Sequence, residues 1–267
     1  MHKSYVHGYS ARENQRLQDQ ASTLTELLHA DSIFPPGSRV LEAGCGVGSQ
    51  TLTLAGKNPG AAFTAIDVSE SSLEQAGRRL NAAGLKNVTL QQADIYHLPF
   101  GPDAFDHVFV CFVLEHLRDP DAALAGLKRV LKSGGSITVI EGDHGSAYFY
   151  PDSPAAHAAI HCQIALQASL GGNALIGREL YPLLKKTGFN EIRVYPRMVY
   201  ADASRPALVD GFIRKTFTAM IEGVREQALA AQMIASQDFD RGIRDLYRTA
   251  APDGTFCYTF FKATGVK

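Results

Sequence analysis

Three glycines near the start of the chain have the spacing of a turn that can hold a ligand. Gly44, Gly46 and Gly48 directly follow the apolar segment 39–43 and precede a helical pattern. Glycine has no side chain, so a ligand can approach the backbone, and the free amides at a helix start favour an anionic or polar group. A tight turn without a ligand is the alternative. The glycines therefore have to be judged together with partners elsewhere in the chain.

Two carboxylates are candidate partners of this turn. Asp67 closes the next apolar segment, 62–66, and a carboxylate there can accept hydrogen bonds from ribose hydroxyls. Asp94 closes the third segment and could accept from an exocyclic amine, while Ile95 packs on the ring. Each residue alone could be a helix cap or a turn residue. Because the features follow three successive strands, the pattern predicts a nucleoside-bearing ligand.

The elements that position these residues alternate between strand and helix. The predicted strands are 39–43, 62–66, 87–93, 105–112, 136–140, 192–200 and 255–262. This alternation predicts an α/β fold with a doubly wound, seven-stranded, mostly parallel sheet and an antiparallel last strand. In such a sheet the ligand lies beyond the carboxyl ends of the strands, where strand order reverses. The first strand–helix turn is that place.

The chain also has segments outside the alternation. Residues 1–37 are predicted as an N-terminal helical segment, and 38–267 as one ligand-binding domain. The segments 143–175 and 202–250 interrupt that domain, and we interpret them as insertions that form a helical cap over the sheet edge. A cap implies an enclosed, small substrate.

Composition limits the classes of function. The chain is 45% hydrophobic and 20% charged with a net charge of −1, values typical of a globular protein rather than a nucleic-acid-binding one. No apolar stretch is long enough to span a bilayer, and the N-terminus has no apolar leader. The four cysteines are far apart, which favours a reducing, cytoplasmic location. We therefore expect neither nucleic acid nor membrane as a partner, and the oligomeric state cannot be read.

Five motifs together resemble the class I S-adenosylmethionine-dependent methyltransferases. They are residues 40–48, 66–67, 93–95, 113–117 and 131–135. The sequence is most similar to the branch that contains ubiquinone and menaquinone biosynthesis enzymes and many natural-product methyltransferases, with O-, N-, C- and S-methylating members. Ser133 departs from the proline that is usual in this family. The resemblance implies S-adenosylmethionine (SAM) as cofactor and methyl transfer to a small molecule.

The resemblance also assigns residues to the donor. Gly44 and Gly46 would lie against its methionine moiety, Asp67 would hold the ribose, and Asp94 with Ile95 would frame the adenine. Cys111 would offer its carbonyl to the methionine amine, although its side chain could simply be core packing. The remaining residues that the resemblance places at the donor are Glu42, Val68 and His116 and, from an N-terminal segment folded over it, Tyr9 and Arg16.

A general base is needed only if the acceptor is poorly ionised. Asp143 and His144 follow the fifth predicted strand and are the candidates, since the ordinary pKa of histidine suits proton transfer near neutrality. A hydrogen bond from His144 to the cap is the alternative. His157 and His161 have the spacing of two metal ligands on one helix, but no further ligand accompanies them. We therefore predict no metal site.

Two other functions stay open. A nicotinamide-dependent oxidoreductase could use the same glycine turn, but its fingerprint wants glycine where the chain has Ser49, and it leaves Asp94 unexplained. A non-catalytic SAM-binding subunit that steadies a partner is the second. A nucleic-acid methyltransferase is disfavoured because Cys111-Phe112-Val113 stands where base-methylating relatives carry an Asn/Asp-Pro-Pro-aromatic segment.

Overall fold

The computed structural model describes residues 11–267, and the chain divides into two compact units. The sheet unit comprises Thr25–Glu141, Ile176–Pro196 and Phe261–Lys267. The helical unit comprises 11–24, Gly142–Leu175 and Arg197–Phe260. The segments interpreted as insertions, 143–175 and 202–250, both belong to the helical unit. Their function as a cap remains a prediction.

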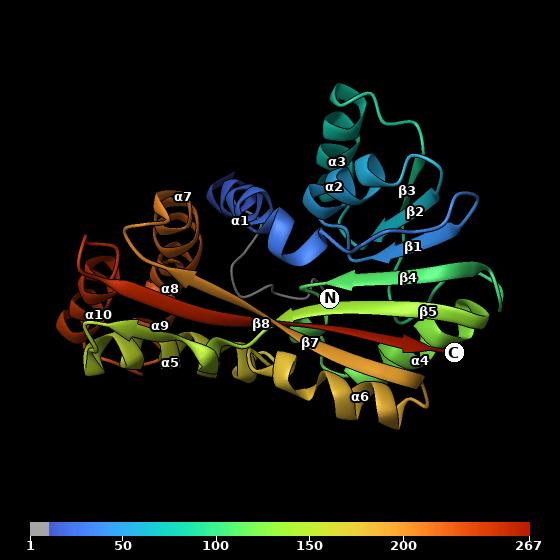
Figure 1. Ribbon diagram of the computed structural model, residues 1–267. Helices are drawn as coiled ribbons and strands as arrows, with labels where there is room; N and C mark the ends of the chain where they lie inside the picture. Colours follow the sequence, from blue (N-terminus) through green and yellow to red (C-terminus); the bar gives the residue numbers. More distant parts are fainter. Residues whose placement is uncertain (1–10) are drawn as a thin grey trace. The chain divides into compact units, whose positions relative to one another are not determined.

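The sheet unit alternates strands and helices, except that β4 follows β3 with no helix between them (Figure 1). Its elements are the end of α1 (Ala11–His29), β1 (Arg39–Ala43), α2 (Ser49–Lys57), β2 (Ala62–Asp67), α3 (Glu70–Ala82), β3 (Val88–Gln92), β4 (Phe105–Cys111), the 3-10 helix η1 (Leu114–His116), α4 (Pro120–Val130), β5 (Leu131–Gly142), the 3-10 helix η3 (Ile176–Glu179), α6 (Leu180–Lys186) and the adjoining parts of β7 (Asn190–Ala201) and β8 (Thr255–Val266).

Strand order in the sheet is β3-β2-β1-β4-β5-β8-β6, and β7 pairs with β8. The pairs from β3 to β5 are all parallel, β6 (Tyr148–Tyr150) is antiparallel to β8, and β8 runs opposite to β5 (Figure 1). The doubly wound α/β fold is confirmed. The chain leaves β1 toward β2 on one side and returns to β4 on the other, so strand order reverses between β1 and β4. This is the position where such sheets bind ligands.

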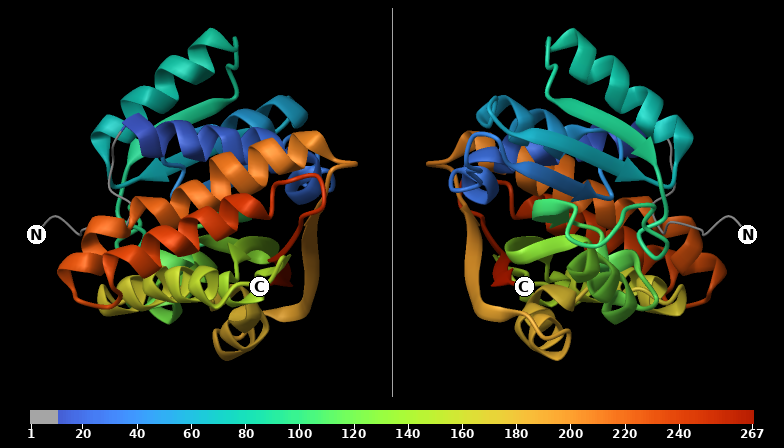
Figure 2. Two further views of the ribbon diagram at one scale, coloured as in Figure 1. Left: turned by 90° about the vertical axis from the view of Figure 1, so that its left-hand side faces the viewer. Right: turned by 90° about the vertical axis from the view of Figure 1, so that its right-hand side faces the viewer.

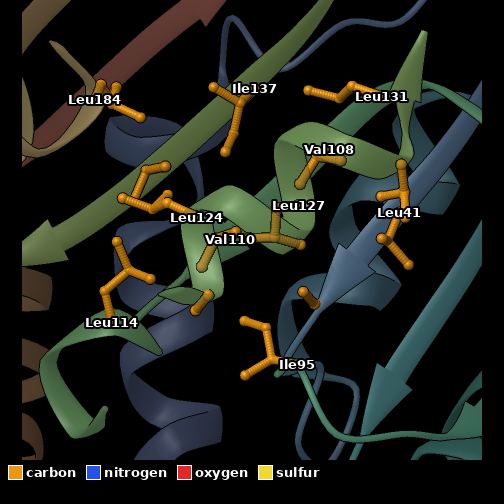
Figure 3. Packing of buried hydrophobic residues seen from close by; sticks show 14 of the residues in the cluster. Leu41, Ile95, Val108, Val110, Leu114, Leu124, Leu127, Leu131, Ile137 and Leu184 are labelled. Atoms are coloured by element: carbon orange, nitrogen blue, oxygen red, sulfur yellow. The ribbon is translucent and has the colours of Figure 1, made fainter. Parts of the chain in front are cut away.

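Helices cover both faces of the sheet unit. In Figure 1, α2 and α3 lie on one side of the strands and α4 and α6 on the other. The side chains between the strands and α4 form the larger core (Figure 3), where Leu41, Val108 and Val110 of the sheet meet Leu124 and Leu127 of α4. These leucines have the 3.6-residue spacing of one helix face, and burial of such side chains contributes roughly 1.5–3 kcal/mol each.

Local sequence accounts for where these helices begin. Ser69 accepts a hydrogen bond from the Ser72 amide at the start of α3, and Asp119 accepts from Ala122 at the start of α4, where Pro120 is the first helical residue. Capping of this kind satisfies amides that have no partner within the helix.

A buried lysine ties β8 to the end of α1. Lys262 Nζ donates to Asp31 Oδ1 at 2.6 Å and to the Leu28 carbonyl at 3.2 Å.

The helical unit is built mainly from helices that lie side by side (Figure 2). Its elements are most of α1, the 3-10 helix η2 (His144–Ser146), β6, α5 (Pro154–Ser169), α7 (Pro206–Leu208), the π-helix η4 (Val209–Thr218), α8 (Ala219–Gly223), α9 (Arg225–Ala230), α10 (Ser236–Arg248) and the adjoining parts of β7 and β8. Among residues 11–267, no helix is both long and apolar enough to cross a bilayer.

Aromatic rings form the centre of the helical unit. Phe212 and Phe217 of η4 pack against Phe256, Tyr258 and Phe260, which occupy alternate positions along β8. Side chains at alternate positions of a strand face the same side, so the order of residues in β8 by itself produces this aromatic row. All five rings are buried.

Two predicted elements differ from the structure. The sheet has eight strands rather than seven, because β6 forms within the segment expected as an insertion. Three residues are too short a run to show strand periodicity. The fifth strand was expected over 136–140 but extends over Leu131–Gly142, with an irregularity in its pairing between Phe105 and His107.

Gly242 lies where α10 crosses α5, and a Cβ built there would be 2.4 Å from the Ala155 carbonyl oxygen. We expect Gly242→Ala to lower the free energy of unfolding by about 1–3 kcal/mol, despite the roughly 1 kcal/mol that alanine gains in a helix. Thermal unfolding measures this. Gly223→Ala is the control, because a Cβ at Gly223 meets nothing within 4 Å. Equal melting temperatures of the two variants would contradict the proposed close packing.

Candidate functional site

The glycine turn after β1 has a backbone that side chains would disturb. Gly44 and Gly46 have φ values of 79° and 52°, in the left-handed region that favours glycine. The Gly44 amide donates to the Ile66 carbonyl at 2.8 Å, which joins the turn to β2. A Cβ on Gly44 would be 2.4 Å from Val113 Cγ2, whereas a Cβ on Gly46 would meet nothing within 4 Å. Gly44 is therefore required for packing, and Gly46 leaves open space for another molecule.

Asp67, at the end of β2, is hydrogen-bonded to this turn. Its Oδ2 accepts from the Gly46 amide at 2.8 Å and its Oδ1 from the Ser69 amide at 2.9 Å. Burial raises the pKa of Asp67, while hydrogen bonds from the backbone act in the opposite direction. An ionised carboxylate offers about four acceptor positions, so each oxygen keeps capacity for a ligand hydroxyl. Val68, the next residue, is exposed.

Glu42 lies on β1, two residues before the turn. Its side chain is only 3% exposed, and its Oε2 has no hydrogen-bond partner among residues 11–267. Burial, assisted by the negative charge of Asp67, raises the pKa of Glu42 to about 7. A buried polar atom without a partner costs about 1–3 kcal/mol, so it marks a position that a donor group of a ligand could satisfy. This orphaned oxygen and the open space at Gly46 fit a polar or cationic ligand.

Asp94 and Ile95 follow β3 and differ in how far their side chains are accessible to a ligand. Asp94 Oδ1 accepts from the Tyr96 amide at 2.9 Å, and its Oδ2 lies 3.5 Å from His97 Nδ1, at the limit of a hydrogen bond. The side chain of Ile95 is buried in the large core (Figure 3), where it is part of the same cluster as Leu127. The structure therefore places Asp94 at the sheet edge, while Ile95 is mainly a core residue.

Cys111 and His116 flank the segment after β4. The Cys111 side chain is buried, and this burial, together with nearby Glu141 and Glu42, raises the pKa of its thiol well above the ordinary value. Its side chain is thus core packing, the alternative noted from the sequence, and only its backbone remains for a ligand. His116 Nε2 lies 3.6 Å from Glu115 Oε1.

Glu141, near the end of β5, is a residue that sequence reasoning did not single out. It is fully buried, and its Oε1 accepts from the amides of Val113 at 3.0 Å and Leu114 at 2.8 Å. The only signal in the sequence is a glutamate directly after the predicted strand 136–140. Its partners are 27 and 28 residues distant and depend on strand order.

The two candidate bases, Asp143 and His144, lie in the helical unit. Asp143 is buried and its Oδ1 accepts from the Gly145 amide at 3.0 Å, as the cap of η2. His144 Nδ1 is 2.6 Å from Tyr258 Oη, and the Phe217 ring packs edge-on against the imidazole. Tyr258 was not identified from the sequence, since it lies 114 residues after His144. The hydrogen bond fixes the orientation of the imidazole.

Two other residues considered from the sequence, Arg16 and His157, have defined partners, and a third, Tyr9, is not described by the structure. Arg16 belongs to the helical unit, where it is buried and donates to Gln20 Oε1 at 2.9 Å. Tyr9 lies outside the described residues. His157 pairs with Asp152 at 2.7 Å. Within residues 11–267, no group of three or more metal-ligating side chains is close enough to hold an ion.

The fold and the glycine turn together are those of a Rossmann-like α/β domain. Residues 41–139 match the family model described as a methyltransferase domain. This part of the chain therefore resembles methyltransferase domains, for which the sequence motifs predicted the class I SAM-dependent type.

Individual proteins are similar in sequence to parts of this chain. An uncharacterized 37.1 kDa protein of a Streptomyces fradiae transposon is 34% identical over 200 residues, which are 74% of this chain and 56% of that protein. Demethylmenaquinone methyltransferase of Clavibacter sepedonicus is 41% identical over 105 residues, 39% of this chain and 41% of that enzyme. The chain spans about half the length of the curated relatives it matches, or less.

A solved structure supports the fold. Phosphoethanolamine N-methyltransferase 2 of Haemonchus contortus, in complex with phosphomonomethylethanolamine and S-adenosylhomocysteine, has a TM-score of 0.58 with this chain. The two are 19% identical, and the match covers 93% of this chain and 53% of the other. At this identity the likeness concerns the fold alone.

The raised pKa of Glu42 makes stability depend on pH. Its ordinary value is 4.5 and its value in the fold is about 7, so in this window the unfolded chain loses a proton that the folded chain keeps. The free energy of unfolding therefore falls by about 3 kcal/mol as pH rises through the window, and this loss stops above it. We expect Glu42→Gln to remove that dependence.

Melting temperatures of wild type and Glu42→Gln at about pH 5 and about pH 8 measure the effect. The variant should gain stability relative to wild type at the higher pH. Glu74→Gln is the control, because Glu74 is exposed and its difference from wild type should be constant. A constant difference for Glu42→Gln as well would show that Glu42 is ionised in the fold at pH 5.

Proposed function

We propose that the protein binds SAM at the carboxyl ends of β1, β2 and β3 and transfers its methyl group to a small molecule. The observation that carries this proposal is the orphaned Oε2 of Glu42 beside a left-handed glycine turn that Asp67 holds. When bound, SAM supplies a methyl group on a sulfonium, which is a strong leaving group. The protein then has to align the acceptor with that methyl group and exclude water.

Each donor contact is proposed from the chemistry of a residue in the sheet unit. Gly44 and Gly46 expose their backbone to the methionine moiety, Glu42 accepts from a polar or cationic group, and Asp67 accepts from the ribose hydroxyls. Asp94 accepts from the adenine amine, and the contact proposed for Ile95 is limited to what its burial in the core leaves free. The further residues of the sheet unit proposed around the donor are Val68, the carbonyl of Cys111 and His116. Arg16 and Tyr9 remain predictions of the resemblance.

His144 is the proposed general base for an acceptor that is poorly ionised, with Asp143 as the second candidate. The bond to Tyr258 supports His144, because a base has to be held in one orientation to accept a proton efficiently. If Nδ1 donates to the tyrosine oxygen, then Nε2 is left as the acceptor for a substrate proton. A thiol acceptor has less need of this step, because part of it is already ionised near neutral pH.

The acceptor is proposed to be a small molecule rather than a nucleic acid or a lipid surface. The near-zero net charge supports this, and so does the relative named for demethylmenaquinone. We also propose a cytoplasmic location, on the basis of cysteines too far apart in sequence to suggest a disulfide framework.

Calorimetry with SAM and with NAD tests the cofactor directly. We expect wild type to bind SAM in preference to NAD, and preferential binding of NAD would favour the oxidoreductase instead.

Asp67→Ala should weaken SAM binding more than about tenfold, since each hydrogen bond to a charged group contributes roughly 1.5–3 kcal/mol. Asp106→Ala is the matched control. Asp106 also accepts from a backbone amide, that of Arg39 at 2.9 Å. It lies at the start of β4, however, whereas the proposed SAM site lies at the carboxyl ends of the strands. Equal affinities of the two variants would contradict the ribose assignment.

For the base, we expect His144→Ala to lower turnover of a phenol or alcohol acceptor by about 10²–10⁴-fold while SAM affinity is unchanged. Tyr258→Phe retains the imidazole but removes its hydrogen bond, so it should shift the pH dependence of turnover. Acceptors come from a panel of thiols, phenols and amines. Full activity of His144→Ala toward a phenol across the pH range would eliminate His144 as the base and leave Asp143 to be tested.

A further inference from the structure

The buried side chain of Glu141 holds the segment after β4 by hydrogen bonds. Glu141 Oε1 accepts from two successive amides, those of Val113 and Leu114, at 3.0 and 2.8 Å. These amides stand at the start of η1, where no helical carbonyl is available to them. The carboxyl group of Glu141, on β5, therefore determines where the chain runs after it leaves β4.

The same segment contains a backbone conformation that needs support. Phe112 has a φ of 58°, which is uncommon for a residue other than glycine and is energetically unfavourable. Its amide donates to the Ile140 carbonyl at 2.9 Å, and the two bonds to Glu141 follow immediately after it. β5 thus fixes the chain on both sides of the left-handed residue.

Val113 connects this segment to the glycine turn. Its Cγ2 would be 2.4 Å from a Cβ on Gly44, so the valine side chain occupies the space that the glycine leaves free. A displacement of Val113 would remove the packing that confines Gly44. The contacts therefore form a continuous chain from Glu141 through Val113 to the turn.

The surroundings of Glu141 act on its pKa in two directions. Burial and the neighbouring Glu115 raise the pKa well above its ordinary value, whereas hydrogen bonds from the backbone amides of residues 113–115 lower it. Its Oε2 has no hydrogen-bond partner among residues 11–267. A glutamine has the same shape, keeps an acceptor oxygen and carries no charge.

We propose that Glu141 is a positioning residue for donor binding: through Val113 and Leu114 it holds the segment after β4 against Gly44. The proposal rests on the proposed function, namely that SAM binds at this turn. Glu141 itself is not assigned any contact with the donor. It acts as the hydrogen-bond acceptor for the two amides.

Calorimetric titration of the full chain with SAM tests this, alongside thermal unfolding without ligand. We expect Glu141→Ala to weaken SAM binding by about tenfold or more and Glu141→Gln to stay within about threefold of wild type. Val139→Ala is the control for lost stability. It removes buried side-chain volume from the same strand but leaves the two hydrogen bonds between Glu141 and the segment after β4 in place, so it should melt earlier and still bind SAM within about threefold of wild type.

The outcomes separate the possible explanations. Wild-type affinity in Glu141→Ala overturns the proposal, and so does an equal loss in Glu141→Gln, since glutamine retains the acceptor. A loss in Val139→Ala as large as that in Glu141→Ala also overturns it, because the effect would then be general destabilisation. If Glu141→Ala does not fold, Val113→Ala decides: weakened binding supports the chain of contacts and unchanged binding overturns it. Absence of SAM binding in wild type would instead contradict the proposed function.

Discussion

The domain depends on confining a left-handed stretch of backbone at the point where strand order reverses. The chain has to turn sharply after β1 through left-handed backbone conformations, which glycine adopts without strain. The surrounding side chains provide the confinement that the glycines lack. Asp67 binds the Gly46 amide from β2, and Val113 packs on Gly44 from the β4 side. A flexible sequence thereby becomes a rigid surface, which lowers the conformational entropy that the protein loses when a ligand binds.

Three buried or half-buried carboxyl groups around this turn have different electrostatic environments. Asp67 receives two backbone hydrogen bonds that stabilise its charge, whereas Glu42 is enclosed without such donors and keeps its proton to higher pH. Glu141 receives two amides but is more deeply buried next to a second acid. Carboxyl groups at one sheet edge thus provide the proposed ligand acceptor, Asp67, an unsatisfied group, Glu42, and a structural acceptor, Glu141. Burial and the number of donors account for the difference.

Much of the sheet could be predicted from sequence because its signals are local. Apolar strands ending in glycine or aspartate predicted the turn, Asp67 and Asp94, and helix caps such as Asp119 marked the helix starts. The contributions of Glu141 and Tyr258 could not be predicted, because their partners come from distant segments whose register is set by tertiary packing. Ile95 illustrates another difficulty. An apolar residue next to a site carries the same sequence signal whether it faces the ligand or the core.

The position of β8 has a consequence for how the protein is made. β5 ends at Gly142 and its neighbour β8 begins at Thr255, so the two pair only after a loop of about 110 residues has closed. Pairing over such a separation is slow, and until it happens β5 presents an open edge to other chains. The buried Lys262 adds to this, because its ammonium group reaches Asp31 and Leu28 from the other end of the sequence. Synthesis is therefore the stage at which this molecule is most exposed to aggregation, and at which chaperones would protect it most.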